Sequence, residues 1–74
     1  EAAAINTEVE QRAMLFELVE RLPEDQRLVV IRRFVDQKSI REIAQELGRS
    51  EGAIKQLQFR ALENLRSQMR SHYE

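Results

Sequence analysis

The sequence predicts an all-α protein, a small four-helix domain that ends in a helix-turn-helix. Two observations carry this prediction. Apolar residues recur at three- and four-residue spacing along most of the chain, which is the period of helices packed on one face. Within residues 39–69, a small residue (Ala44), a turn glycine (Gly48) and an aliphatic residue (Ile54) follow the spacing that two closely crossing helices need.

Length and composition restrict the class of protein. With 74 residues, the chain suits one small domain whose core is near the lower limit of independent stability. A content of 42% hydrophobic and 34% charged residues is typical of a soluble helical domain. The absence of cysteine excludes disulfides and thiolate metal sites. No apolar run is long enough to cross a bilayer and no signal peptide is visible, so we expect a cytoplasmic protein without a membrane partner.

The chain begins at Glu1 rather than at methionine, so we expect a fragment of a longer protein. We predict that residues 1–6 are a linker or a cloning remnant and that residues 7–70 form the domain. Residues 71–74 are expected to be a tail.

Charge is distributed unevenly along the chain. The net charge is −1, which by itself argues against a nucleic-acid partner. Residues 1–26, however, hold seven acidic and two basic residues, a net charge of −5, whereas residues 27–74 hold six acidic and ten basic residues, a net charge of +4. A basic part joined to an acidic part is typical of a local DNA-binding surface. Ordinary solvated helix faces are the alternative.

The first helix is predicted to begin at a cap formed by Asn6-Thr7 and to run to about Arg21. Its polar residues Glu10, Glu17, Glu20 and Arg21 cluster on one side. The apolar residues that we expect to pack against the core are Met14, Leu15, Leu18, Val19 and Leu22, widened by Val9, Ala13 and Phe16.

Leu22-Pro23-Glu24-Asp25 marks a boundary, because proline disfavours helix at the residue before it and suits the first turn after it. A second helix is predicted from there to about Asp36. It carries two apolar stripes, which indicate a central helix touched from several sides. The alternative is that one stripe stays exposed for a protein partner. The stripes consist of Leu28, Ile31 and Val35, and of Val30 and Phe34.

Both helices of the helix-turn-helix carry start signals. Ser39 and Glu42 fit a capping box, and Ser50 is a good cap for the last helix. Gln58 lies inside the apolar arc of the last helix, and Phe59 lies on its polar side. Such departures from pattern tend to mark function, although one exposed aromatic residue is common. The predicted core residues of the two helices are Ile40, Ile43, Ala44, Leu47, Ile54, Leu57, Ala61, Leu62, Leu65 and Met69.

No constellation of catalytic residues is present. The only histidine, His72, lies in the expected tail, and two glycines cannot form a glycine-rich phosphate loop. No metal-ligand spacing occurs. We therefore expect a protein that is not an enzyme and that needs no cofactor or metal.

The pattern favours DNA binding, because the amino-terminal part of the second helix of such a motif reaches base edges in the major groove. Basic side chains there can contact phosphate or guanine, an amide can pair with adenine, and an aromatic ring can pack on a thymine methyl group. Ser50 can act as a cap instead, and Glu51 can merely complement the helix dipole. The DNA-binding candidates are Arg41, Arg49, Ser50, Glu51, Lys55, Gln56, Phe59 and Arg60.

From about Leu22 to Arg66, the chain resembles the carboxy-terminal region-four domain of bacterial RNA polymerase sigma factors, and in particular the extracytoplasmic-function group. The resemblance rests on a combination of segments, since the Ile-Ala-Gln-Glu-Leu-Gly piece alone occurs in many helix-turn-helix families. The segments are Leu22-Pro23-Glu24-Asp25-Gln26-Arg27, Arg33-Phe34-Val35, Ser39-Ile40-Arg41-Glu42-Ile43-Ala44-Gln45-Glu46-Leu47-Gly48, Ser50-Glu51-Gly52-Ala53-Ile54-Lys55 and Arg60-Ala61-Leu62.

The resemblance implies a winged-helix-like fold without the wing, and a domain that binds the upstream promoter element through the second helix of the motif. It also implies docking on the flap of the polymerase β subunit through the apolar surface of the last three helices, and an anti-sigma factor as a further partner. The base-reading residues that it implies are Lys55, Gln56, Phe59 and Arg60. Many relatives carry a basic residue at the position of Leu57 and an aliphatic residue at the position of Gln58. This difference affects which promoter sequence the domain would recognise, and not its fold.

The domain that melts the promoter is absent from these 74 residues, so we expect binding without initiation. Two alternatives stay open. One is the output domain of a response regulator, which carries a similar motif and usually dimerises. The other is a helical module bound chiefly by a protein such as an anti-sigma factor.

Overall fold

The computed structural model describes the backbone of residues 2–73 and the side chains of residues 8–71. Within residues 2–73 there is no β-strand, which confirms the all-α prediction. The helices are α1 (Ala2–Glu20), α2 (Glu24–Val30), α3 (Ile40–Leu47) and α4 (Glu51–Tyr73), and a π-helical turn, η1 (Ile31–Val35), continues α2.

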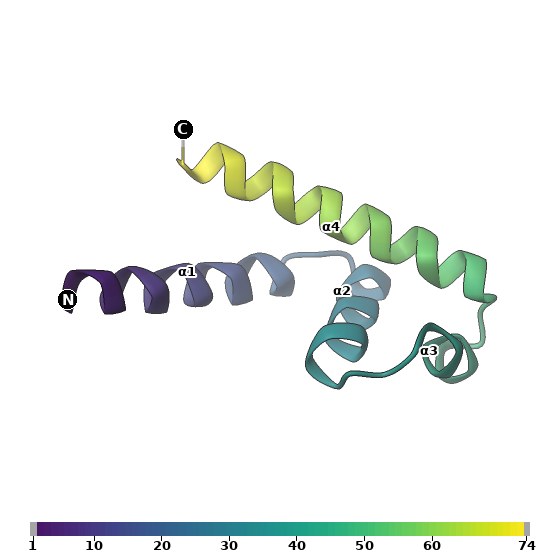
Figure 1. Cartoon of the computed structure of the whole chain (residues 1–74). Helices are drawn as coiled ribbons and strands as arrows, with labels where there is room; N and C mark the ends of the chain where they lie inside the picture. The colour runs from purple at the N-terminus through teal and green to yellow at the C-terminus, as the bar shows by residue number, and fades with distance from the viewer. Residues whose placement is uncertain (1, 74) are drawn as a thin grey trace.

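The long helix α4 organises the molecule (Figure 1). It contacts α1, α2 and α3, and its axis follows the long dimension of a domain that measures 44 × 23 × 15 Å. Helix α1 lies beside the carboxy-terminal half of α4, while α2 and α3 pack against its amino-terminal half. The helix-turn-helix therefore occupies one end of the molecule and α1 the other.

Two helix ends differ from prediction. Helix α1 begins at Ala2, so the cap predicted at Asn6-Thr7 is wrong. Alanine has the highest helix propensity, and the run of alanines at residues 2–4 extends the helix beyond the polar pair. Helix α4 continues to Tyr73, into the predicted tail. The division into linker, domain and tail stays a prediction.

The core consists of two clusters. The first, here the helix-turn-helix core, joins α2, α3 and the start of α4. The second, here the α1 core, joins α1, the end of α2 and the later turns of α4. The helix-turn-helix core contains Val29, Ile43, Ala44, Ile54 and Leu57, with Ile40 and Leu47 packed against it. The α1 core contains Leu18, Leu22, Val30, Ala61 and Leu65, with Met14, Val19 and Met69 packed against it.

The apolar face predicted for the first helix is only partly buried. Leu18 and Leu22 are buried as expected, whereas Val9, Ala13, Leu15 and Phe16 are exposed. The physical reason lies in the arrangement of the helices: α1 packs along one side only, against α4 and α2. The wider apolar face thus has no partner within the described residues.

The second predicted helix is formed, but its last turn is widened. In η1, the amide of Asp36 donates to the carbonyl of Ile31 at 3.0 Å, which is the five-residue spacing of a π-turn. Beyond it, Gln37 adopts a positive φ of 57°. Phe34 and Val35 are exposed, one from each predicted stripe, whereas Val30 is buried and Leu28 and Ile31 are half-buried, so neither stripe is exposed along its whole length.

Ion pairs fix the segment between η1 and α3. Lys38 Nζ lies 2.6 Å from a carboxylate oxygen of Glu46, and Arg32 Nε lies 3.4 Å from the other oxygen of the same group. Arg32 also lies 3.6 Å from Asp36. Glu46 of α3 is thus held by two cations from the preceding turn, which orients α3 relative to α2.

Both predicted start signals are confirmed. In the capping box of α3, the Glu42 amide donates to Ser39 Oγ, and the Ser39 amide donates to Glu42 Oε1, each at 3.1 Å. The hydrogen bond from the Ser39 amide lowers the pKa of the Glu42 carboxyl, with smaller contributions from the Ser39 side chain and from the charge of Lys38. At the start of α4, the Ala53 amide donates to Ser50 Oγ at 3.1 Å.

Candidate nucleic-acid interface

Helix α4 presents two opposite faces. On its inner face, Ile54, Leu57 and Ala61 are buried against α2 and α3 or against α1. The outer face of the same turns carries four exposed side chains, those of Lys55, Gln56, Phe59 and Arg60. A helix anchored by one face with a polar and basic opposite face has the geometry that entry into a DNA groove requires.

Phe59 is 63% exposed on this outer face, as its position in the sequence predicted. An aromatic ring that stays exposed to water contributes little burial energy to the fold. It can pack on an apolar group of a ligand, such as a thymine methyl group.

Two residues beside the inner face of α4 depart from the usual burial pattern: a leucine that is exposed and a glutamine that is half-buried. Leu62, predicted to be core, is 37% exposed and belongs to neither core cluster. Gln58 is half-buried, and its Oε1 atom is shielded from solvent without a hydrogen-bond partner. An unpaired buried amide oxygen costs about 1–3 kcal/mol.

The turn between α3 and α4 is tightly defined. Gly48 ends α3 with a left-handed φ of 65°, and the Arg49 amide donates to the carbonyl of Ala44 at 2.9 Å. A Cβ atom on Gly48 would meet no atom within 4 Å, so the glycine is required by its backbone angle and not by lack of space. The turn sets the angle at which α4 leaves α3.

An open hollow of about 370 Å³ lies on the outer side of this turn, here the α3–α4 hollow. It brings together four of the predicted DNA-binding residues, Arg41, Arg49, Ser50 and Glu51. The remaining four, on the outer face of α4, do not line it. Its other lining residues are Ala44, Gln45 and Gly48.

Ser50 and Glu51 both take part in the start of α4, as the structural alternatives to base contact predicted. The Ser50 hydroxyl accepts the Ala53 amide and is therefore engaged as a helix cap. Glu51 is exposed in the first turn of α4, where a carboxylate complements the helix dipole. Neither position prevents contact with a ligand.

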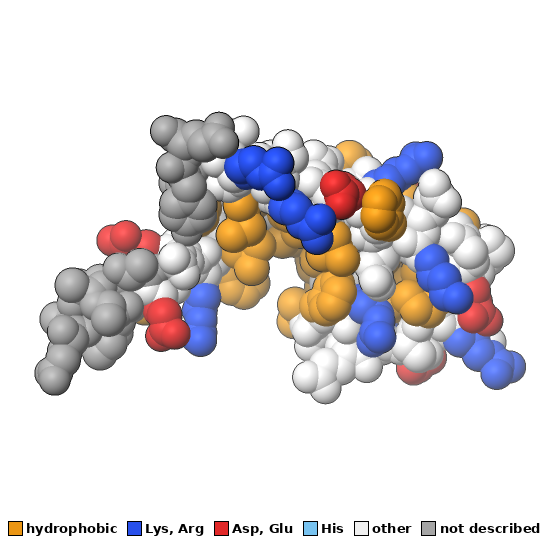
Figure 2. Space-filling model, turned by 45° about the horizontal axis from the view of Figure 1, so that its top comes forward, with side chains coloured by type: hydrophobic (Ala, Val, Ile, Leu, Met, Phe, Trp, Pro, Cys, Tyr) orange, Lys and Arg blue, Asp and Glu red, His pale blue; other side chains and the backbone are white. Residues whose placement is uncertain are grey.

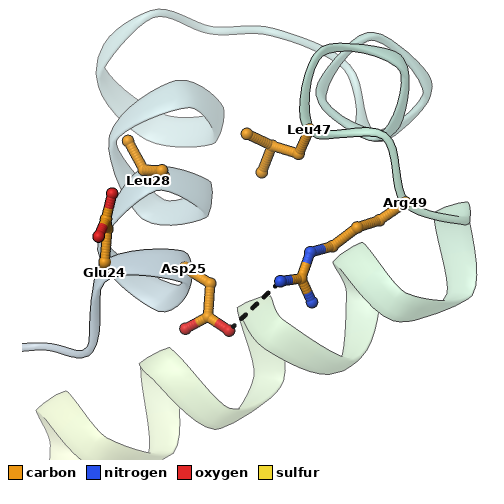
Figure 3. Close-up of a pocket in the computed structure, with 5 residues that line it drawn as sticks. All are labelled: Glu24, Asp25, Leu28, Leu47 and Arg49. Atoms are coloured by element: carbon orange, nitrogen blue, oxygen red, sulfur yellow. Dashed lines mark ion pairs between the residues drawn. The ribbon is translucent and has the colours of Figure 1, made fainter.

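Arg49 has a partner that sequence reasoning did not predict. Its guanidinium lies 3.9 Å from the carboxylate of Asp25, in the first turn of α2 (Figure 3). The two residues share a second hollow of about 370 Å³, here the α2 hollow, with Glu24, Leu28 and Leu47. In the sequence Asp25 reads only as a helix-start residue, and its distance of 24 positions from Arg49 gives no signal of the contact.

Basic side chains lie mostly outside α1, which holds only Arg12. Figure 2 shows acidic side chains at the end where α1 lies and also at the opposite end, where they are interspersed with Lys and Arg side chains. The uneven charge along the sequence therefore does not separate into an acidic and a basic end of the molecule.

Other classes of site find no support in the described part of the chain. Among these residues, no group of three or more His, Cys, Asp or Glu side chains is arranged to hold a metal ion. His72 lies outside the residues whose side chains are described. No described helix has the length and apolar character needed to cross a membrane.

The fold and this surface define a helix-turn-helix domain of the DNA-binding type. Residues 12–65 match the model of the family described as sigma-70, region 4. The chain therefore belongs to the sigma-70 region 4 family, which is a family of promoter-recognition domains without enzymatic activity.

A solved structure agrees with the family match. The chain is similar to a chain in the 1.8 Å structure of the RsbN–BldN complex, with a TM-score of 0.76 and 40% sequence identity. The similarity covers 77% of this chain and 41% of that one. BldN is a sigma factor of the extracytoplasmic-function group, so the resemblance to that group is confirmed. Among curated proteins, no match was found.

Proposed function

We propose that the outer face of the first three turns of α4 reads the upstream promoter element in the major groove. The observation that carries the proposal is the exposure of Lys55, Gln56, Phe59 and Arg60 on one face, while the opposite face of these turns is buried. Membership in the sigma-70 region 4 family supports it. It also favours a sigma factor over a response-regulator output domain.

The chemistry of each side chain determines the DNA contact that we assign to it. Lys55 and Arg60 contact phosphate oxygens or guanine acceptors, Gln56 pairs with an adenine edge, and Phe59 packs on a thymine methyl group. Arg41 and Arg49 contact phosphates and fix the orientation of the domain. Ser50 and Glu51, at the start of α4, lie within reach of the same groove.

The test is a fluorescence-anisotropy titration against a duplex that carries the upstream promoter element of the parent regulon, beside a scrambled duplex, at two salt concentrations. We expect preference for the true element and a linear salt dependence. Four phosphate contacts would give a log–log slope of about −3.6. The variant Lys55→Ala/Arg60→Ala should lose both the preference and most of the affinity.

A matched control removes the same charge from the same helix. Arg66 and Arg70 are exposed on the later turns of α4, beyond the part of a recognition helix that reaches base edges. The variant Arg66→Ala/Arg70→Ala should therefore keep the preference. Equal loss in both double variants would show that net charge, and not the outer face of the first turns, governs binding.

We further propose that Phe34 and Val35 dock on the flap of the polymerase β subunit. Both are exposed apolar residues at the end of η1, a segment that ion pairs hold against α3. Phe34→Ser/Val35→Ser should abolish binding of the isolated flap segment and leave the DNA titration unchanged. Loss of both kinds of binding would instead indicate unfolding.

An anti-sigma factor is the partner that we propose for the exposed apolar face of α1. Val9, Ala13 and Phe16 lie at helical spacing on that face and have no partner among the described residues. The similar chain was solved in the RsbN–BldN complex, which supports a protein partner for this domain. The face is distant in the fold from the helix-turn-helix, so Phe16→Ser should impair capture of the partner without impairing DNA binding.

A further inference from the structure

We propose that Asp25 is a positioning residue that competes with DNA phosphate for Arg49. In the free domain the carboxylate of Asp25 holds the guanidinium over the α2 hollow. On DNA the side chain turns to a phosphate on the other side of the turn. The proposal rests on the proposed function, because it assigns Asp25 a part in the same interface.

The position of Arg49 permits both placements. Its side chain lines the α2 hollow and also the α3–α4 hollow, so it stands on the ridge between them. Its own backbone is fixed by the hydrogen bond from its amide to Ala44. Rotation of the side chain alone therefore moves the charge from one hollow to the other, without any change in the turn.

Asp25, in contrast, is held in place. Its Oδ1 atom accepts the Gln26 amide at 2.8 Å, which leaves Oδ2 to face Arg49. Leu28 and Leu47 project from α2 and α3 into the same hollow (Figure 3). The carboxylate is thus an anion fixed at the start of α2, in a hollow that Glu24, Leu28 and Leu47 also line, and the guanidinium is the mobile partner.

The contact is weak enough to be exchanged. The two atoms are 3.9 Å apart, and the side chains of Arg49 and Asp25 are 47% and 40% exposed. Exposed ion pairs of this kind change an equilibrium by only about two- to fivefold. Asp25 therefore lowers DNA affinity by a factor of that size and does not abolish binding. The number of phosphates contacted in the complex stays the same.

The variant Asp25→Asn tests this competition. It keeps an oxygen that can accept the Gln26 amide and removes only the charge. We expect DNA affinity to rise about two- to fivefold, with an unchanged salt slope. Arg49→Gln should weaken binding and make the slope shallower by about 0.9. In the Arg49→Gln background, Asp25→Asn should have no effect beyond that of the control.

Glu24→Gln is the matched control. Glu24 neighbours Asp25 in the first turn of α2 and lines the same hollow, yet none of the ion pairs in the described structure involves it. The control removes the same charge from the same helix end, so it reproduces any effect of net charge or of the helix dipole. Circular dichroism of each variant shows whether the fold is retained.

The outcomes separate the two proposals. A gain for Asp25→Asn that exceeds the gain for Glu24→Gln, and that disappears without Arg49, supports the competition. Equal gains, or a gain that persists in Arg49→Gln, overturn it while DNA reading by α4 stands. If the wild type shows no preference, or Lys55→Ala/Arg60→Ala keeps it, the proposed function itself fails, and the role of Asp25 fails with it.

Discussion

The two halves of the core share α4 but are closed to different degrees. In the helix-turn-helix core, Val29, Ile43 and Ile54 are completely buried. In the α1 core, the only completely buried residue is the small Ala61. The helix-turn-helix is also fixed by a capping box, a glycine turn and the ion pairs of Glu46, whereas α1 carries an exposed apolar face.

A chain of this size concentrates its rigidity in one part of the fold. A small domain buries too little surface to close every side of every helix. Here the largest completely buried side chains belong to the part that must hold α4 at a fixed angle to α3. The end that carries α1 keeps apolar surface, as a domain does where another surface covers it.

Truncation of one apolar side chain in each half should affect stability very differently. Ile54→Ala should lower the free energy of unfolding by about 2–5 kcal/mol, because it leaves a cavity at a completely buried site. Phe16→Ala, at a side chain that is 64% exposed, should change it by no more than about 0.5 kcal/mol. Urea unfolding followed by circular dichroism measures both.

If Ile54→Ala fails to fold, Ile54→Val takes its place, with an expected loss of about 0.5–1.5 kcal/mol. Similar losses for Phe16→Ala and the Ile54 variant would contradict the division into a closed and an open half.

A smaller effect is expected at the two glycines of the helix-turn-helix, with opposite signs. Gly48→Ala forces a residue with a Cβ atom into a φ of 65°, which costs about 1–2 kcal/mol although the space is free. Gly52 lies in the first turn of α4, and its added Cβ would meet only Ser50 Oγ at 4.0 Å. Gly52→Ala should therefore stabilise the domain, by up to about 1 kcal/mol.

Thermal unfolding of the two variants beside the wild type decides the signs. A fall in midpoint for both would mean that Gly52 is needed for a close approach within the domain. No change for Gly48→Ala would mean that the turn relaxes and does not set the helix angle.

Prediction from sequence succeeded where local chemistry decides the structure. Ser39 with Glu42, Gly48 and Ser50 each carry a signal that acts over a few residues, and each is confirmed. The buried faces of α3 and α4 followed from helical period alone, apart from Leu62. Membership in the sigma-70 region 4 family was also predicted from short segments of these helices.

Prediction failed where the burial of an apolar helix face depends on whether another helix packs against it. The same period that places Ile54 in the core places Phe16 on an apolar face, and nothing in the sequence says that only one of them is covered. The pair of Asp25 with Arg49 joins two helix ends that are distant in sequence. Such contacts follow from the packing of α2 beside the turn, which no local pattern reports.

The smallest effect concerns the capping box, and acid should remove the part of it that depends on the Glu42 carboxylate. Ser39→Ala should cost about 1 kcal/mol at neutral pH, since the Glu42 amide loses its acceptor. The hydrogen bonds to Ser39 hold the pKa of Glu42 below its unfolded value of 4.5. The carboxylate therefore contributes stability that is fully present above pH 4.5 and is lost as the pH falls through the lowered pKa of the folded state.

Glu42→Gln isolates that charge, because its side-chain oxygen can still accept the Ser39 amide. We expect the wild type to be the more stable of the two at pH 7 and the difference to vanish on acidification below pH 4.5, as measured by urea unfolding at a series of pH values. A difference that stays constant down to pH 3 would show that the carboxylate gains nothing from the box. In that case the start of α3 would be held by the hydrogen bond from the Glu42 amide to Ser39 Oγ, and the closed half of the molecule would owe its rigidity to packing, to the glycine turn and to the ion pairs of Glu46.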